Sequence, residues 1–128
     1  MKSFVKSWKS SVQPRKQHKY SYNAPLNIRQ KFVGVHLSKE LREKHGLRSM
    51  ALRKGDEVKI SRGQYKGKTA KVERVDLKKS KAYLAGIDMI KKDGSKTLYP
   101  ISPSNLIIRS LNLEDKKRKK ILDRVGKK

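Results

Sequence analysis

From Arg53 onward, apolar and polar residues alternate with a period of two, which is the pattern of β-strands that bury one face. Four runs are predicted as strands: Asp56–Ile60, Thr69–Glu73, Ala82–Ala85 and Leu106–Arg109. In the first run, Val58 and Ile60 share one face and the charged residues beside them share the other. Val75 breaks the parity of the second run, which predicts a β-bulge there.

A tight turn is indicated by Asp93-Gly94, which lies between Met89-Ile90 and Leu98-Tyr99. Asp-Gly tolerates the positive φ angles of a primed turn, so these residues predict a β-hairpin. The hairpin brings the expected strands to five, joined by turns that contain glycine. Such a set of short strands favours a small β-barrel, because a closed barrel leaves no unpaired edge.

Helices are predicted only outside this region. A short helix is expected after Pro25, and a second one follows Ser38, whose side chain can cap it. Gly46 is expected to end the second helix in the left-handed conformation. A third helix is predicted over Asn112–Val125, with Asn112 as its cap. The first 23 residues are rich in Ser, Lys and Gln, and we expect them to form an extended arm.

The composition adds a strong positive charge to this picture. The 128 residues include 35 Lys and Arg against 11 Asp and Glu, a net charge of +24, and only 34% are hydrophobic. The small apolar fraction implies a small core and disfavours an enzyme with a dry active-site cavity. Self-repulsion at this charge favours a polyanionic partner, with nucleic acid as the first choice and an acidic membrane surface as the second.

Several kinds of site are excluded or disfavoured. The sequence has no cysteine, which excludes disulfides, thiolate zinc sites and thiol nucleophiles. The three histidines, His18, His36 and His45, share no short ligand spacing, and no Ser is arranged with a His and an acid. We therefore expect no metal, no cofactor and no catalytic residues. The longest aliphatic run, Leu106–Ile108, is too short for a membrane span, and no signal peptide is recognised.

The distribution of charge divides the chain into three parts. Residues 1–50 carry 12 basic and 2 acidic side chains, and residues 113–128 carry 8 and 3, so neither part is expected to close a core alone. We predict a basic N-terminal arm with two short helices (1–50), a barrel (51–111) and a basic C-terminal helix and tail (112–128).

The most informative segment is a predicted strand, loop and strand over residues 54–72. Gly63 and Gly67 flank the loop and free the backbone to turn sharply or to approach another surface. The side chains beside them are suited to phosphate pairing, amide hydrogen bonding and base stacking: Arg62, Gln64, Tyr65, Lys66 and Lys68. An ordinary hairpin with a solvated basic tip is the alternative interpretation.

This segment resembles the KOW motif of SH3-like barrels in ribosomal proteins and transcription elongation factors, with the characteristic glycine at Gly67 and Ala70 in place of a second glycine. The flanks extend the resemblance over nearly the whole chain, through Ser11–Gln17, Asn23–Pro25, Leu37–Arg42, Leu47–Met50, Ile101–Asn105 and Arg118–Leu122. Together they are similar to the archaeal and eukaryotic branch of the ribosomal large-subunit protein twenty-four family, numbered twenty-six in eukaryotes. The short C-terminus is closer to the archaeal form.

The resemblance implies a five-stranded SH3-like barrel with short helices and basic extensions. It further implies a structural protein of the cytoplasmic ribosome that binds the 5′ region of large-subunit (23S-type) rRNA, supports early assembly and lies near the nascent-chain tunnel exit. Expected partners are this rRNA, neighbouring ribosomal proteins and nascent-chain factors at the exit, with no membrane and no homo-oligomer. Two alternatives are a KOW module of an elongation factor and a chromatin-type small barrel that coats duplex DNA.

The residues expected to contact RNA lie in the arm, the loop and the C-terminal helix. They are Arg15, Lys16, Lys19, Arg29, Lys31, Arg48, Arg62, Gly63, Gln64, Tyr65, Lys66, Gly67, Lys68, Lys116, Lys117, Arg118, Lys119 and Lys120. Phe4 and Trp8 are further candidates for insertion into RNA or a protein groove. Asp56 and Glu57 are adjacent on a strand, so their carboxylates diverge, and we expect them to pair with neighbouring Lys or Arg.

Overall fold

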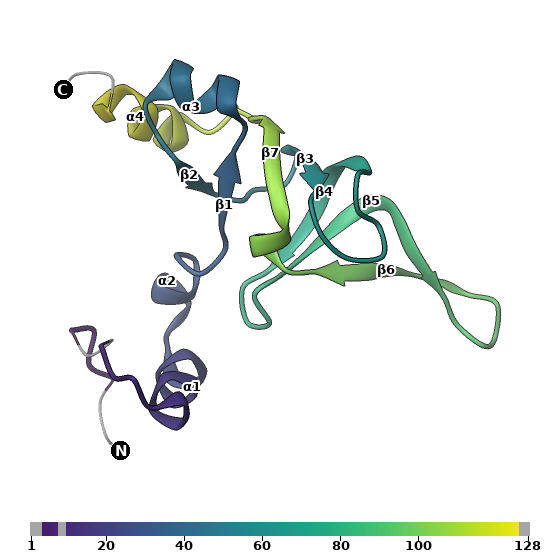
Figure 1. Ribbon diagram of the computed structural model, residues 1–128, viewed down its shortest axis with the longest axis horizontal. Coiled ribbons are helices and arrows are strands. Elements are labelled where there is room, and N and C mark those ends of the chain that lie inside the picture. Colours follow the sequence, from purple (N-terminus) through teal and green to yellow (C-terminus); the bar gives the residue numbers. More distant parts are fainter. Residues whose placement is uncertain (1–3, 8–9, 126–128) are drawn as a thin grey trace.

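The computed structural model describes residues 4–7 and 10–125, which form a sheet flanked by short helices (Figure 1). The strands are β1 (Gly34–Leu37), β2 (Ser49–Ala51), β3 (Glu57–Ile60), β4 (Thr69–Asp76), β5 (Lys81–Ile90), β6 (Lys96–Ile101) and β7 (Leu106–Ser110). The helices are α1 (Pro14–Asn23), α2 (Leu26–Arg29), α3 (Lys39–His45) and α4 (Lys116–Val125), with a 3-10 turn, η1, at Pro103–Asn105. No helix among these residues is long and apolar enough to cross a membrane.

The seven strands follow one another in the sheet as β2-β1-β7-β3-β4-β5-β6. Every pairing is antiparallel except that of β1 with β7, where His36 lies beside Ile107. Within the described residues, β2 and β6 are end strands, so the sheet is not closed and the predicted five-stranded barrel is not confirmed. The mainly-β prediction is confirmed, and the sheet is wider than expected because β1 and most of β2 come from residues assigned to the arm.

The core lies on one face of this sheet and follows the predicted alternation. Val58 and Ile60 are fully buried, as the period of two in β3 requires. Val35 and Leu37 of β1 are equally buried, although the sequence analysis predicted no strand before Asp56. The apolar residues of β1 alternate as those of β3 do, but residues 1–50 were assigned to a basic arm on their composition, so this strand was not predicted.

The irregularity predicted in β4 is present. Val72 lies opposite Leu84, whereas Arg74 lies opposite Tyr83, so β4 has one more residue than β5 over this stretch. The extra residue shifts the parity and turns Val75 toward the core cluster. The predicted bulge is therefore confirmed.

The predicted hairpin joins β5 to β6 and projects from the rest of the sheet (Figure 1). Its turn differs from the prediction, because Gly94 has a φ of 85° but Asp93 has no positive φ. Lys91 N–H donates to the carbonyl of Ser95 at 2.9 Å, and Gly94 N–H donates to that of Lys91 at 3.0 Å. The connection is thus a three-residue loop with one left-handed glycine, and the prediction of a two-residue primed turn was wrong.

The helix predicted after Ser38 is confirmed as α3, and both the predicted cap at Ser38 and the predicted end at Gly46 are present. The Ser38 hydroxyl accepts a hydrogen bond from the backbone of Leu41, and Gly46 ends the helix with a φ of 64°. These are the ordinary start and stop signals of a helix, which depend only on nearby residues. The short helix predicted after Pro25 is also present, as α2.

The N-terminal segment is more ordered than the sequence analysis expected. Residues predicted as extended arm form α1, which begins at Pro14 and buries none of its side chains. Proline is well suited to the first turn of a helix, so Pro14 is a local signal for the start of α1. Phe4 packs on Tyr20, with ring centres 4.9 Å apart, so its ring has a partner within the chain. Trp8 lies outside the described residues.

The C-terminal helix is present but begins four residues later than predicted. Asn112 does not cap it: its side-chain oxygen accepts from Glu114 N–H ahead of the helix, and its backbone N–H donates to Asp56, just before β3. Instead, the side chain of Asp115 accepts a hydrogen bond from Lys117 N–H at 2.8 Å. The start of α4 is therefore displaced by a tertiary contact that the local pattern does not contain.

Candidate nucleic-acid interface

The loop between β3 and β4 is a compact turn rather than an open connection. Gly67 N–H donates to the carbonyl of Ile60 at 2.8 Å, and Lys66 N–H donates to that of Gly63 at 3.2 Å. Gly63 and Gly67 have φ angles of 99° and 88°, in agreement with the prediction that glycines here free the backbone to turn sharply. A Cβ at either glycine would meet no atom within 4 Å, so the backbone angle, and not a lack of space, requires glycine.

The side chains of this loop divide into an exposed set and an anchored one. Arg62, Gln64, Lys66 and Lys68 are exposed. Tyr65 is half-buried; its hydroxyl donates to the carbonyl of Asp88 at 2.9 Å, and its ring packs edge-on against Tyr99. Lys68 places its ammonium 5.2 Å from the centre of the Tyr65 ring. Tyr65 therefore fastens the loop to β5 and has less free ring surface for a base than the sequence suggested.

Helix α4 presents a basic face and buries one of its cations. Lys116, Lys117, Lys119 and Lys120 are exposed, whereas Arg118 keeps only 3% of its side chain accessible. We therefore remove Arg118 from the set of RNA contacts predicted from the sequence. Arg118 precedes the buried Leu122 by four residues, which places it on the apolar side of the helix. This spacing could have indicated from the sequence that Arg118 is buried.

Arg118 is engaged by Asp56, which is fully buried. Its guanidinium donates to both carboxylate oxygens, at 2.7 Å to Oδ2, and also to the carbonyls of Ala51 and Asn112. The same carboxylate accepts the backbone N–H groups of Arg53 and Asn112. The expectation that Asp56 pairs with a basic residue is met by a partner 62 positions away rather than by a neighbour.

The cations of the N-terminal segment also fall into two groups. Arg15, Lys16 and Lys19 are exposed on α1, and Lys31 and Arg48 are exposed further along the chain. Arg29 instead donates to the backbone carbonyls of Tyr22, Ala24 and Lys78. These contacts join the end of α1 to the turn between β4 and β5. Arg29 therefore positions the arm, and only its remaining N–H groups are available to a ligand.

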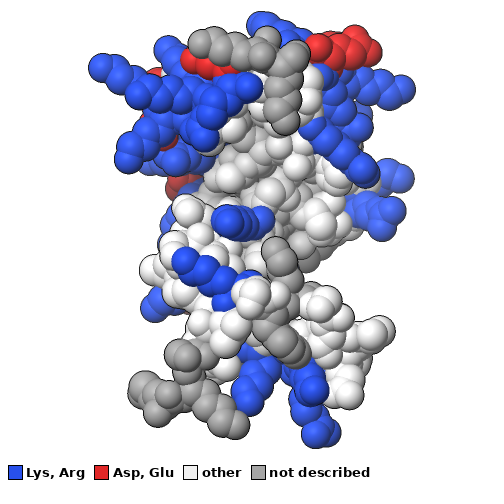
Figure 2. Space-filling view, turned by 90° about the vertical axis from the view of Figure 1, so that its left-hand side faces the viewer, with Lys and Arg blue, Asp and Glu red and all other residues white. Residues whose placement is uncertain are grey.

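The predicted RNA contacts do not form one patch. In Figure 1, α1 lies at one end of the molecule, α4 lies beside α3 at the other, and the loop between β3 and β4 lies across β7 from α4. Figure 2 shows the face on the side of α3 and α4, where Lys and Arg side chains gather near these helices and again near α1. Asp and Glu occupy only small areas of this face. The basic groups are thus spread around the molecule.

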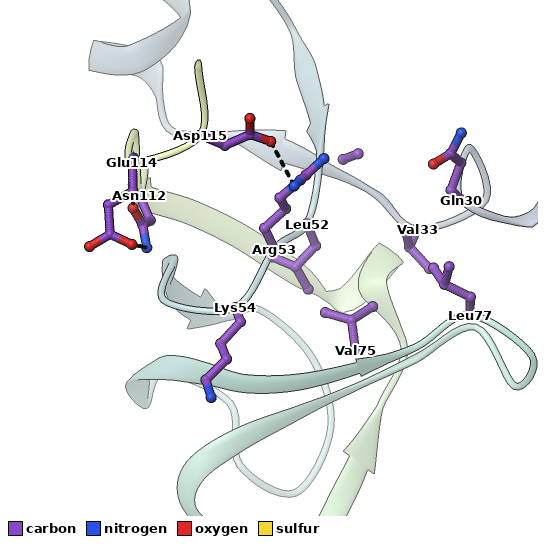
Figure 3. Close-up of a pocket in the computed structure, with 11 residues that line it drawn as sticks. Gln30, Val33, Leu52, Arg53, Lys54, Val75, Leu77, Asn112, Glu114 and Asp115 are labelled. Atoms are coloured by element: carbon purple, nitrogen blue, oxygen red, sulfur yellow. Dashed lines mark hydrogen bonds and ion pairs between the residues drawn. The ribbon is translucent and has the colours of Figure 1, made fainter. Parts of the chain in front are cut away.

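A hollow of about 520 Å³ lies between α2, the segment before β3 and the residues that precede α4 (Figure 3). Val33, Leu52 and Val75 give it an apolar wall. Its rim carries charges of both signs, with Arg53 and Asp115 paired at 2.7 Å. This mixture of charges does not favour a polyanion.

Comparison with known protein sequences relates the chain to ribosomal proteins. Residues 11–125 match the family described as ribosomal proteins L26 of eukaryotes together with their archaeal counterparts. The chain is 46% identical over 114 residues to large ribosomal subunit protein uL24 of Methanosphaera stadtmanae, covering 89% of this chain and 97% of that relative. It is 44% identical over 116 residues to the protein of the same name from Korarchaeum cryptofilum, covering 91% and 88%. The chain therefore belongs to this family of ribosomal proteins, called L26 in eukaryotes and uL24 in these archaea.

Proposed function

We propose that the chain is a structural constituent of the large ribosomal subunit that binds large-subunit rRNA. Its family consists of ribosomal proteins and not of enzymes, so its place of action is the ribosome of the cytoplasm. The site on the rRNA that we propose is the 5′ region, with a role in early assembly and a position near the nascent-chain tunnel exit. Neighbouring ribosomal proteins and factors at that exit are the further partners of this proposal.

One observation carries the RNA-binding proposal. In the part of the chain that the structure describes, ion pairs with a carboxylate are made only by Arg53 and Arg118. The other basic side chains of the described residues have no carboxylate partner there, although the net charge of the full sequence is +24. RNA phosphates would supply the missing counter-charges and release the counterions that surround the RNA.

The arrangement of these side chains supports contact with several RNA segments at once. The exposed lysines of α4, the loop around Gly67 and the exposed cations of α1 lie on different parts of the molecule (Figure 1). Folded RNA brings phosphate-rich strands close together, and a protein with spread basic elements neutralises them where they meet. We infer a mechanism of phosphate neutralisation at several points, with the compact loop reading the shape of the RNA backbone.

We also infer that the consecutive strands β7-β3-β4-β5-β6 form the curled unit of an SH3-like KOW fold, within residues 51–111. Two observations support this, namely five strands that are neighbours in the sheet and register shifts in both pairings of β5. Bulges of this kind bend a strand and allow a short sheet to curl. Residues 1–50 and 112–128 would then be extensions that complete the core and carry much of the basic surface.

A salt titration with two nucleic acids tests the RNA-binding proposal. The full chain is titrated with a transcript of the 5′ region of a large-subunit rRNA and, separately, with duplex DNA of equal length. Contact with six to ten phosphates should lower the affinity by about 10³-fold or more between 50 and 200 mM salt. The rRNA should bind more tightly at every salt concentration. A flat salt dependence contradicts the proposal, and equal or tighter binding of DNA favours the chromatin-type alternative.

A further inference from the structure

A second hollow, of about 480 Å³, lies where β1, α3, the start of the β3–β4 loop and η1 meet. Its lining consists of His36, Arg42, Ser61, Arg62, Ser104, Asn105, Leu106 and Ile107. None of these residues is acidic, in contrast to the hollow of Figure 3. Its charged groups are two guanidinium groups, each fixed in sign at any ordinary pH.

Both arginines are placed to receive an anion. Arg42 is held by a hydrogen bond of 2.8 Å from its Nε to the carbonyl of Leu37, and its terminal nitrogens have no partner among the described residues. The side chain of Arg62 is exposed and also has no partner in the described part of the chain. A guanidinium with unpaired terminal N–H groups is the protein donor that best matches phosphate geometry.

The remaining walls are polar and fixed by the fold. The backbone N–H and the hydroxyl of Ser61 both donate to the carbonyl of Asn105, each at 2.8 Å, which ties the loop to η1. Ser104 and Asn105 then lie beside Arg62 at the hollow. The Nδ1 of the His36 imidazole is buried without a hydrogen-bond partner among the described residues, so one polar group of the lining remains unsatisfied by them. A preformed hollow of this kind needs little ordering on binding.

We propose that this hollow, named here the His36–Arg62 pocket, holds one backbone phosphate of the rRNA between Arg42 and Arg62. The inference rests on the proposed function and gives it a defined contact, which none of the exposed lysines provides. Because Ser61 joins the loop to η1, a phosphate held here would also fix the loop around Gly67 against the RNA. Arg42, His36, Ser104 and Asn105 are thereby added to the residues that the sequence indicated.

The first test compares two substitutions that remove the same charge. Arg62→Gln changes the pocket, whereas Arg109→Gln changes an exposed arginine of β7 that does not line it. Loss of one charge-assisted contact should weaken binding of the rRNA transcript by about tenfold to a hundredfold and lower the salt slope by about one. Arg109→Gln should change the affinity by less than about threefold. Because both side chains are exposed, thermal melting should be unchanged for both variants.

The second test locates the phosphate on the RNA. Neutral methylphosphonate linkages are placed one at a time in a synthetic fragment of the bound rRNA. The wild-type protein should lose about tenfold in affinity at one linkage, and Arg62→Gln should lose nothing further at that linkage. The pocket assignment is overturned if Arg62→Gln binds like Arg109→Gln, or if it keeps the wild-type response at every linkage. Failure of the wild-type protein to prefer the rRNA over duplex DNA would instead overturn the proposed function, and the pocket assignment with it.

Discussion

Asp56, immediately before β3, and Arg118 on α4 form an ion pair in the interior, with Arg118 Nη2 2.7 Å from Asp56 Oδ2. Both side chains are almost completely buried. The carboxylate also accepts two backbone N–H groups, and the guanidinium also donates to two carbonyls. A buried pair of this kind contributes to a single well-defined arrangement, since either charge left alone would be strongly unfavourable. The exposed lysines of α4 are therefore carried on a helix whose position on the sheet is fixed.

The first prediction concerns this pair. Asp56→Asn removes the carboxylate and leaves a buried guanidinium without a counter-charge, so the free energy of unfolding should fall by about 3–5 kcal/mol. Urea unfolding followed by circular dichroism measures the change. Asp123→Asn is the matched control, because Asp123 is an exposed residue of the same helix and should cost less than about 0.5 kcal/mol. A loss below about 1 kcal/mol for Asp56→Asn would show that the pair does not hold α4 in place.

The second prediction concerns the lysines of the β3–β4 loop. Lys66→Glu with Lys68→Glu reverses two exposed charges, so the rRNA affinity should fall by about a hundredfold while the fold is retained. The lost contact between Lys68 and Tyr65 should cost at most about 1 kcal/mol of stability. Lys78→Glu with Lys79→Glu makes the same change of charge at the turn between β4 and β5 and serves as the control. Equal effects of the two double variants would mean that only total charge matters and that the loop is a connector.

The third prediction concerns the backbone of the same loop. Gly67→Val forces a β-branched residue into a φ of 88°, so it should destabilise the protein by about 1–3 kcal/mol or open the loop. Gly34→Ala is the control, because Gly34 has no positive φ and a Cβ there would meet only the carbonyl of Lys31 at 3.7 Å. Thermal melting should show a clear loss for Gly67→Val and little change for Gly34→Ala. A Gly67→Val protein with wild-type stability and RNA affinity would contradict the role given to this glycine.

The fourth prediction concerns the β5–β6 turn and pH. The hydrogen bonds from the side chain and backbone of Ser95 lower the pKa of Asp93 below its ordinary value. A lowered pKa in the folded state means that the contribution to stability is present above the unfolded pKa and is lost as the pH falls through the folded one. Ser95→Ala should raise the pKa of Asp93 toward its ordinary value, as followed by NMR titration of its carboxyl carbon. Because alanine keeps the backbone N–H, an unchanged titration curve in Ser95→Ala would show that the hydroxyl bond is not formed in solution.

The fifth prediction concerns limited proteolysis of the protein without RNA. Trypsin should cut within α1, after Arg15, Lys16 or Lys19, because this helix buries none of its own side chains. Cleavage should stop before Val33, since Val33, Val35 and Leu37 are buried and β1 pairs with β7. Mass spectrometry of the stable fragment gives its first residue. A stable fragment that begins near Arg53 would mean that β1 and β2 are held only weakly.

How much could be predicted from the sequence depended on the distance between the interacting residues. The cap at Ser38, the glycine at position 46 and the alternation in β3 were predicted correctly because each is determined by residues a few positions away. Strand β1 was missed because residues 1–50 were assigned to an arm on their charge, and Ile107, the β7 partner of His36, lies 71 residues further on. The burial of Arg118 had a local signal in its spacing from Leu122, but its partner Asp56, 62 positions away, could not be found from the sequence.

In the candidate site, too, features determined by nearby residues could be predicted and features determined by distant residues could not. The exposed cations and the left-handed Gly67 could be predicted because they depend on residue type and local turn geometry. The convergence of Arg42 and Arg62 could not, since it requires α3, η1 and the β3–β4 loop to meet in space. Arg29 was similarly expected to contact RNA, whereas its position is defined by three carbonyls, two from the end of α1 and one from a turn 49 residues away.

The parallel pairing of β1 with β7 has a consequence for the order of synthesis. Strand β1 is made early, yet the neighbour that joins it to the rest of the sheet is residues 106–110. The charge of Asp56 is likewise not compensated in the interior until Arg118 has been synthesised. While the chain is being made, Val35 and Leu37 therefore lack their final environment until the last quarter has been added. Completion of the core is thus coupled to completion of the chain, and a truncated product would expose both its apolar strand and its unpaired acid.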